Sequence, residues 1–269
     1  MAITYYMLQI NPVILFALMV ASGAIAGAFA TFFFRKYIRV KVLRSHNEVT
    51  GFLFLAIASF YALLLSFVVF VVWDQLNEIQ SNVSKEGSSA MGLYRDIKYY
   101  PDTIRSKPLM TAYLDFVYNV LDEEFPNMAK MQSSRKTNES FSQVFYEIER
   151  LDPQNTFHIQ LVSRMFNHLN ELSTFRGLRT SSLEMEMPAP MWMPILLGAF
   201  ITLLCSVLMD IEHKKMHVGL NSLLGAIIGM FLFIIILLDH PYTGSIAIQP
   251  RSYQQIFTLD QWENEHNTK

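Results

Sequence analysis

The sequence predicts an all-α membrane protein with four transmembrane helices and a helical extramembrane bundle into which the second helix continues. Of the 269 residues, 52% are hydrophobic and 13% are aromatic. Four apolar runs contain no charged side chain, and each is close to the roughly 20 residues that span a bilayer. A long polar segment between the second and third runs has helical periodicity and little that resembles a strand.

The runs are 12–34, 49–73, 191–209 and 218–238. They divide the chain into a first transmembrane pair (1–73), a helical extramembrane domain (74–190), a second pair (191–238) and a C-terminal tail (239–269).

Basic residues gather in the two short loops between the runs, at Arg35, Lys36, Arg39, Lys41, Arg44, Lys214 and Lys215. No Lys or Arg precedes the first run, so we expect this run to be an uncleaved membrane anchor. Loops rich in Lys and Arg stay in the cytoplasm. We therefore expect an integral protein of a bacterial inner membrane or a plasma membrane, with the termini and the helical domain outside and with membrane lipids as partners.

Small residues in the first run predict close helix packing. Gly23 and Gly27 form a Gly-x-x-x-Gly pair, and Gly225 and Gly229 repeat that spacing in the fourth run. Such spacing lets two helix backbones approach closely in lipid. The partner helix belongs either to the same subunit or to a neighbouring one.

The second run begins with a capping box, in which Ser45 and Glu48 satisfy each other's backbone amides. One broad helical stripe follows, at three- and four-residue steps. Its pore-lining candidates are Ser59, Phe60, Leu63, Ser66, Phe67, Phe70 and Asp74. Either the phenylalanines pack against other helices and the serines bond back to their own helix, or the stripe lines a narrow passage in an oligomer.

Apolar spacing continues past Trp73, so the second helix is expected to run on to about Tyr100, where Pro101 ends it. Gly87 and Gly92 are places where it could kink.

The rest of the polar segment predicts a helical bundle. We expect an amphipathic helix over 107–131 with Pro108 in its first turn, then a polar loop over 132–138 and a short helix over 141–148. Asp152-Pro153 predicts the start of a further helix that runs to about Leu183. A terminal helix is expected over 253–262.

The sequence contains no catalytic constellation, phosphate loop or dinucleotide motif, so we expect neither an enzyme nor a cofactor. His46, His213 and His217 share one side of the membrane, but we expect no metal site there. The net charge of −2 gives no nucleic-acid footprint. Cys205 is the single cysteine and lies in an apolar run.

Positive charge also lies on the last helix of the bundle, at Arg176 and Arg179. Either these side chains form salt bridges with Glu78, Glu86 or Glu171, or they form a vestibule that attracts anions.

Asn221 and Ser222, in the fourth run, are expected to hydrogen-bond to another helix.

Four strings resemble the bestrophin-like family of prokaryotic and plastid membrane proteins. They are His46-Asn47-Glu48-Val49-x-Gly51-Phe52, Tyr61-Ala62-x-Leu64-Leu65-x-Phe67-Val68-Val69, Trp73-x-Gln75 and Leu238-Asp239-x-Pro241-Tyr242-x-Gly244. His46, Glu48 and Asp239, which stand in these strings, join the two arginines as vestibule or coupling candidates.

The family is distantly related to bestrophins, which are pentameric anion channels whose second helices surround a hydrophobic neck. The resemblance implies that Ser59, Phe60, Ser66 and Phe67 line such a neck. The acidic calcium-clasp run of animal bestrophins has no match here.

The resulting hypothesis is a homo-oligomer, most simply a pentamer, that conducts small anions such as chloride through a pore lined by the second helix. The alternative is a non-conducting membrane-anchored scaffold or sensor, whose helical domain binds a partner or ligand through Asp239 to Gly244 and the two arginines.

Overall fold

The computed structural model describes residues 6–37, 47–184, 187–209, 211–244 and 246–266. Over these ranges all regular secondary structure is helical. Four of the described helices are long and apolar enough to cross a membrane, which confirms the predicted fold class. The chain forms two compact units, one comprising Met1–Leu76 and Glu186–Ile246, the other Asn77–Met185 and Ala247–Lys269. We call them the membrane unit and the bundle unit.

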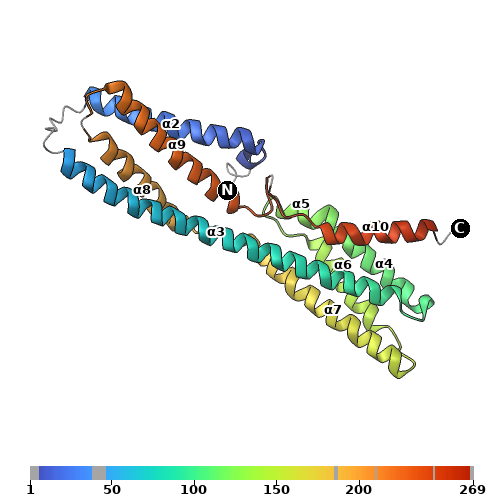
Figure 1. Cartoon of the computed structure of the whole chain (residues 1–269). Coiled ribbons are helices and arrows are strands. Elements are labelled where there is room, and N and C mark those ends of the chain that lie inside the picture. Colours follow the sequence, from blue (N-terminus) through green and yellow to red (C-terminus); the bar gives the residue numbers. More distant parts are fainter. Residues whose placement is uncertain (1–5, 38–46, 185–186, 210, 245, 267–269) are drawn as a thin grey trace. The chain divides into compact units, whose positions relative to one another are not determined.

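The membrane unit contains α2 (Pro12–Tyr37), the first part of α3 (Asn47–Lys98), α8 (Ala189–Val207) and α9 (Lys214–Leu238). Figure 1 shows α2 lying beside α9, its main packing partner. An apolar core joins α3, α8 and α9, and its buried members include Leu65, Ile195 and Ile235.

Glycines bring α2 and α9 into backbone contact. A Cβ atom added to Gly23 would overlap the carbonyl of Gly225, and one added to Gly27 would overlap that of Asn221. The glycine pairs therefore pack two helices of the same chain against each other. Since each of these positions lacks room for a methyl group, their spacing sets the distance between the two helices.

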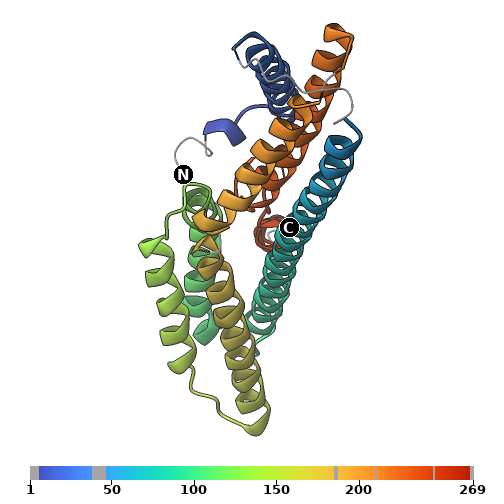
Figure 2. The same cartoon turned by 90° about the vertical axis from the view of Figure 1, so that its left-hand side faces the viewer.

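The bundle unit contains the remainder of α3 and the other helices, shown in green, yellow and red in Figure 2. These are α4 (Thr103–Asn119), the π-helix η2 (Val120–Glu124), α5 (Phe125–Met128), α6 (Arg135–Glu149), α7 (Thr156–Ser181), the 3-10 helix η3 (Ser182–Glu184) and α10 (Arg251–His266). Its core includes Leu93, Tyr113, Phe116, Leu169 and Ile256, from α3, α4, α7 and α10.

Helix α3 is 52 residues long, or about 78 Å at 1.5 Å per residue. It ends at Lys98, three residues before Pro101, as the sequence predicts. The assigned helix continues through Gly87 and Gly92. A Cβ atom on Gly92 would lie 2.7 Å from Nε2 of His168, so this glycine makes room for a side chain of α7.

Two predicted helix starts in the bundle unit are wrong because other residues act as caps. Helix α4 begins at Thr103, since the Asp102 carboxylate accepts a hydrogen bond from the Arg105 amide at 3.1 Å. Pro108 therefore lies inside α4 and not in its first turn. Helix α7 is capped by Asn155, whose side chain accepts from the His158 amide at 2.8 Å. Asp152 instead contacts Arg105, at 3.5 Å.

The predicted polar loop over 132–138 is also too long. Ser134 caps α6 by accepting a hydrogen bond from the Thr137 amide at 3.3 Å, so the helix begins at Arg135. The expected helix over 107–131 is interrupted by η2, where five residues adopt π-helical geometry. The terminal helix α10 is longer than expected, from Arg251 to His266.

Candidate functional site

The stripe on α3 is exposed along its whole length in the isolated chain. Phe60 is 75% exposed and Phe67 is 60% exposed. The other exposed members are Ser59, Leu63, Ser66, Phe70 and Asp74. Large aromatic side chains in this arrangement form an apolar surface that a soluble monomer rarely presents.

The opposite face of the same helix segment is buried. Tyr61, Leu65, Val68 and Val72 follow each other at four- and three-residue steps and are at most 7% exposed. Tyr61, Leu65 and Val68 pack in the core shared with α8 and α9. A Cβ on Gly198 would overlap the Tyr61 ring, so α8 approaches α3 closely there. Packing within the chain therefore fixes which way the stripe points in the membrane unit.

This exposure bears on the two interpretations of the stripe. The phenylalanines do not fill the core between helices of this chain, so lipid or other subunits must cover them unless they face a passage. Ser59 does bond back to its own helix, because its hydroxyl donates to the Leu55 carbonyl at 2.7 Å. Back-bonding satisfies that hydroxyl while leaving the stripe's surface apolar.

The two arginines of α7 lie in a buried ion-pair cluster. Nε of Arg179 donates to Glu86 at 2.6 Å, and its Nη2 donates to both Glu86 and Glu124. Arg176 pairs with Glu124, with Nε to Oε1 at 3.1 Å, and donates to Asn138 at 2.7 Å. Arg179, Glu86 and Glu124 are all at most 1% exposed. This burial favours the ion-pairing interpretation over an open vestibule.

Electrostatics and burial compete in this cluster. Burial alone raises the pKa of Glu124, but the charge of Arg179 and the hydrogen bond from Arg176 outweigh it and lower the pKa below its ordinary value. The glutamate is therefore ionised and the cluster is close to neutral, with two carboxylates facing two guanidinium groups. Such mutual pairing is what makes buried charges tolerable.

Helix α10 joins this cluster through Tyr253, whose hydroxyl donates to Glu86 at 2.6 Å. Burial, followed by the Glu86 charge, raises the pKa of Tyr253 well above its ordinary value. The phenol therefore stays protonated and keeps its hydrogen bond.

A second polar contact joins α3 to α7. Asp96 is buried and accepts hydrogen bonds from Arg164, with Nε at 2.9 Å, while its other oxygen lies 2.9 Å from Nδ1 of His168. The sequence search did not identify Asp96 or His168. The signal for Asp96 was its spacing, because Glu86, Ser89 and Asp96 recur along one side of α3. Ser89 also contacts α7, since it donates to Glu171 at 3.1 Å.

Among the remaining coupling candidates, His46 lies outside the described residues, as does Ser45 of the predicted capping box. Glu48 is exposed in the first turn of α3. Asp239 is buried and accepts a hydrogen bond from the Met187 amide at 2.8 Å, which ties the end of α9 to the segment before α8. The turn after it closes at Gly244, whose φ of 84° favours glycine.

Asn221 links α9 to two other helices of the membrane unit, as the sequence predicts. Its side-chain amide donates to the Thr31 hydroxyl of α2 at 2.8 Å, and its oxygen accepts from Ser206 of α8. Ser222 donates to the Ala24 carbonyl at 3.0 Å. Thr31 and Ser206 complete this contact. The sequence analysis did not link them to Asn221, although polar residues in apolar runs mark such sites.

Across the described ranges no group of three or more His, Cys, Asp or Glu side chains is placed to hold a metal ion. His217 is buried, with Nε2 3.1 Å from the Ser206 carbonyl, and His213 is exposed just before α9.

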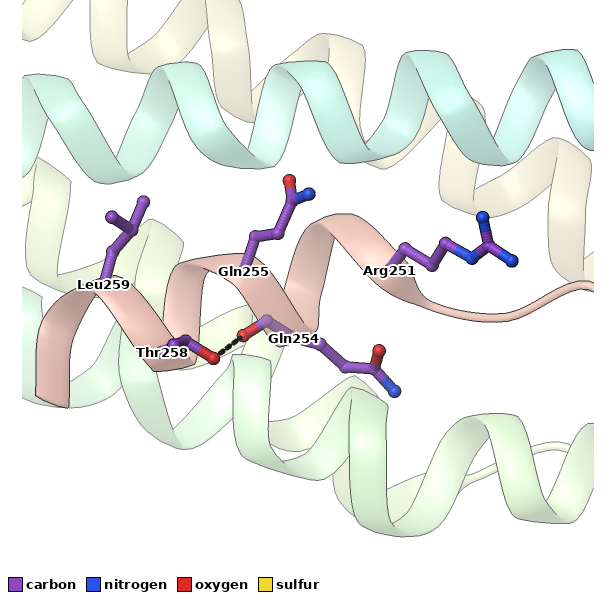
Figure 3. A pocket seen from close by; sticks show the side chains of 5 residues that line it. All are labelled: Arg251, Gln254, Gln255, Thr258 and Leu259. Carbon is purple, nitrogen blue, oxygen red and sulfur yellow. Dashed lines mark hydrogen bonds between the residues drawn. The ribbon is translucent and has the colours of Figure 1, made fainter. Parts of the chain in front are cut away.

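An open pocket lies on the exposed side of α10. Figure 3 shows its lining residues, which are Arg251, Gln254, Gln255, Thr258 and Leu259. All five belong to one helix, and the Thr258 hydroxyl donates to the Gln254 carbonyl at 2.9 Å. These side chains include no general base for the Thr258 hydroxyl, which is bonded back to its own helix, so we do not treat the pocket as an active site.

Solved structures share this fold. Two mutants of a bacterial Bestrophin homolog from Klebsiella pneumoniae match with TM-scores of 0.65 and 0.64 at 14% and 13% identity, over 90% of this chain and 97% and 96% of theirs. A third mutant matches with a TM-score of 0.57 at 14% identity, over 93% of this chain and 99% of its own. At these identities the likeness establishes the fold. No functionally curated protein matches the sequence.

The sequence itself carries the family signature. The profile of the Bestrophin-like domain matches residues 22–253, which is most of the 269-residue chain. The matched region includes α3 with its stripe, the ion-pair cluster and the turn after α9. This all-α membrane protein therefore belongs to the Bestrophin-like family.

Proposed function

We propose that the protein is a homo-oligomeric ion channel whose conducting path is lined by the stripe on α3. One observation carries the proposal, namely that Phe60, Leu63, Phe67 and Phe70 are exposed on a helix whose opposite face is buried within the chain. A ring of subunits around one axis would give these residues a common surface. Head-to-tail subunit contacts close into such rings when the rotation allows it.

The chemistry of the stripe suits a constriction. Phenyl rings offer no hydrogen bonds to water, and a narrow apolar passage controls ion flow by losing its water. The buried residues Leu65 and Val68 on the other side of α3 hold the helix in place. This packing therefore fixes how far the rings project into the path.

The finer points of the proposal come from the family resemblance and the charge pattern. The family resemblance implies a pentamer and implies chloride as the conducted ion. Chloride is therefore the first ion to test. The basic loops support a helical domain outside the cytoplasm. Arg176 and Arg179 act as coupling residues within the bundle unit, where both are buried and paired.

Recording from the purified protein in a planar bilayer tests the proposal. We expect unitary currents that change in conductance or open time in Phe60→Ala and Phe67→Ala. The matched control is Phe200→Ala on α8, because Phe200 is 62% exposed but lies off the stripe. A silent wild type, or variants on the stripe that behave like the control, would contradict the assignment of the path.

A second candidate is a non-conducting scaffold or sensor, supported by exposed apolar side chains on the bundle unit. Ile104 is 85% exposed and Tyr99 is 74% exposed. Their size and exposure suit a protein partner better than water. The mass of the protein in detergent separates the two functions, since a monomer has no shared axis for α3 to line.

A further inference from the structure

Two buried hydroxyl groups in the membrane unit have no hydrogen-bond partner. Tyr61 of α3 is 7% exposed and Thr202 of α8 is 2% exposed. Within the part of the chain that the structure describes, neither the phenol oxygen of Tyr61 nor Oγ1 of Thr202 forms a hydrogen bond. An unpaired buried hydroxyl costs free energy, and native cores normally supply such groups with a partner.

Close contacts at two levels show that α3 and the α8 helix run antiparallel. Near the start of α3, a Cβ atom on Gly51 would lie 3.7 Å from Cε of Met209, just after the end of α8. Further along α3, a Cβ on Gly198 would lie 2.4 Å from Cδ2 and 2.7 Å from Cε2 of Tyr61. The Tyr61 ring therefore lies directly against α8 at Gly198.

This geometry directs the two hydroxyls toward each other. Side chains on a helix lean toward its N-terminus, so the Tyr61 ring leans toward the start of α3, which lies beside the end of α8. Thr202 follows Gly198 by one turn in that direction, and its own side chain leans back toward Gly198. The two hydroxyls thus converge on one part of the contact between α3 and α8 without bonding to each other.

The surroundings restrict which molecule can join the two groups. The core shared by α3, α8 and α9 is apolar, and Ile195, Ala199 and Ile228 are among its buried members. An ion would be costly in such a place, whereas a neutral molecule that both donates and accepts hydrogen bonds suits two hydroxyls. Ordered water fills this role in protein cores, where it typically makes about three hydrogen bonds to polar groups that otherwise have no partner.

We infer that the hydroxyls of Tyr61 and Thr202 bind one internal water molecule, which joins α3 to α8. This water extends a buried polar row, because Ser206 follows Thr202 by one turn on α8 and donates to Asn221 of α9. It lies on the face of α3 opposite the stripe, so it helps to hold α3 against the rest of the membrane unit. The inference goes beyond the proposed function and does not depend on it, since it holds equally if the protein does not conduct.

Thermal unfolding in detergent tests whether the two hydroxyls share a partner. Tyr61→Phe and Thr202→Val each remove one hydroxyl at nearly constant volume. We expect each to lower Tm by about 2–4 °C, because the water is released and the other hydroxyl loses its partner. The double variant should lose no more than the larger single loss, since no hydroxyl then remains unpaired. The matched control is Tyr37→Phe, which removes the hydroxyl of a residue that is 62% exposed and should change Tm by no more than about 2 °C.

A structure of the wild type at a resolution that shows ordered water is the second measurement. Density within about 2.5–3.0 Å of both hydroxyl oxygens, absent from Tyr61→Phe, together with the coupled losses in Tm, supports the inference. A direct hydrogen bond between the two side chains, density too large for water, or no density beside them would overturn it. Single variants that leave Tm unchanged or raise it would also overturn it, because that is the effect of removing a hydroxyl that has no partner.

Discussion

Replacing Arg179 with methionine is expected to destabilise the bundle unit strongly. Methionine fills a similar length of space, but the substitution leaves the carboxylates of Glu86 and Glu124 buried around the single guanidinium of Arg176. Both glutamates are at most 1% exposed, so water does not solvate the excess charge. Removing one partner of a buried pair costs about 3–5 kcal/mol.

The assay is thermal unfolding of the purified protein in detergent. One kcal/mol shifts Tm by roughly 2–4 °C in a chain of this size, so Arg179→Met should lower Tm by about 10 °C. The control is Arg135→Met, the same change in an exposed pair with Glu139, where the arginine side chain is 93% exposed. Such surface pairs contribute about 0–1 kcal/mol, so its Tm should change by no more than about 4 °C.

A double variant makes the reasoning refutable. Adding Glu86→Gln to Arg179→Met restores neutrality, because one carboxylate and one guanidinium then remain, and the amide oxygen can still accept from Tyr253. We expect the double variant to regain several degrees over Arg179→Met. A loss in Arg179→Met no greater than in Arg135→Met, or a double variant less stable than the single one, would show that charge balance does not stabilise this core.

Three further predictions concern other contacts. Gly225→Leu should abolish the monodisperse folded peak in gel filtration, because its Cβ would overlap the Gly23 carbonyl. Gly219→Leu on the same helix is the control and should fold, because a Cβ there has open space. Equal behaviour of the two variants would refute the close contact between α2 and α9. Leu65→Ala removes a buried side chain and should lower the free energy of unfolding by about 2–5 kcal/mol. Phe67→Ala removes an exposed one and should change it by no more than about 0.5 kcal/mol in a monomeric detergent preparation. The reverse order in a Tm series would contradict the assigned faces of α3. The pKa of Glu124 is lowered in the fold, so its stabilisation is complete above the ordinary value of 4.5 and is lost as pH falls through the lowered value. The Tm of the wild type should therefore fall more steeply than the Tm of Glu124→Gln as pH falls from 4.5 to the lowered value, and parallel slopes would contradict this role.

The sequence was sufficient for the features that depend on local composition. Apolar length alone identifies the four spans, and periodicity carries α3 beyond Trp73 into the bundle unit. Small-residue spacing identifies the contact between α2 and α9, although not which chain supplies the partner helix. The side of the stripe on α3 was also predictable, because helical geometry fixes which residues share a face.

Features that depend on a choice among equivalent local residues were not predictable. The segment from Asp152 to Asn155 offers two good capping residues, and the structure uses Asn155 while Asp152 contacts Arg105 of α4. Of the three glutamates named for the two arginines, Glu86 pairs with Arg179, whereas Glu171 accepts from Ser89. Glu124 was not named, yet it pairs with both arginines. Such selection is decided by tertiary packing.

The π-helix at Val120–Glu124 has the same kind of origin. Pro126, just after it, has no amide hydrogen to continue the α-helical pattern, but a proline alone does not predict a π-helical turn. Its last residue, Glu124, lies in the sequence 55 residues before its partner Arg179, and contacts of that separation leave no trace in periodicity.

The backbone contact between α2 and α9 also has a consequence for biosynthesis. Thr31 and Asn221, which bond across this contact, are 190 residues apart in the chain. At about 5–20 residues per second, a ribosome needs roughly 10–40 s to make the second of them after the first. During that interval the glycine face of α2 has no partner from its own chain and must be shielded by lipid or by the insertion machinery. The last transmembrane helix to be made is thus the one that completes the packing of the first.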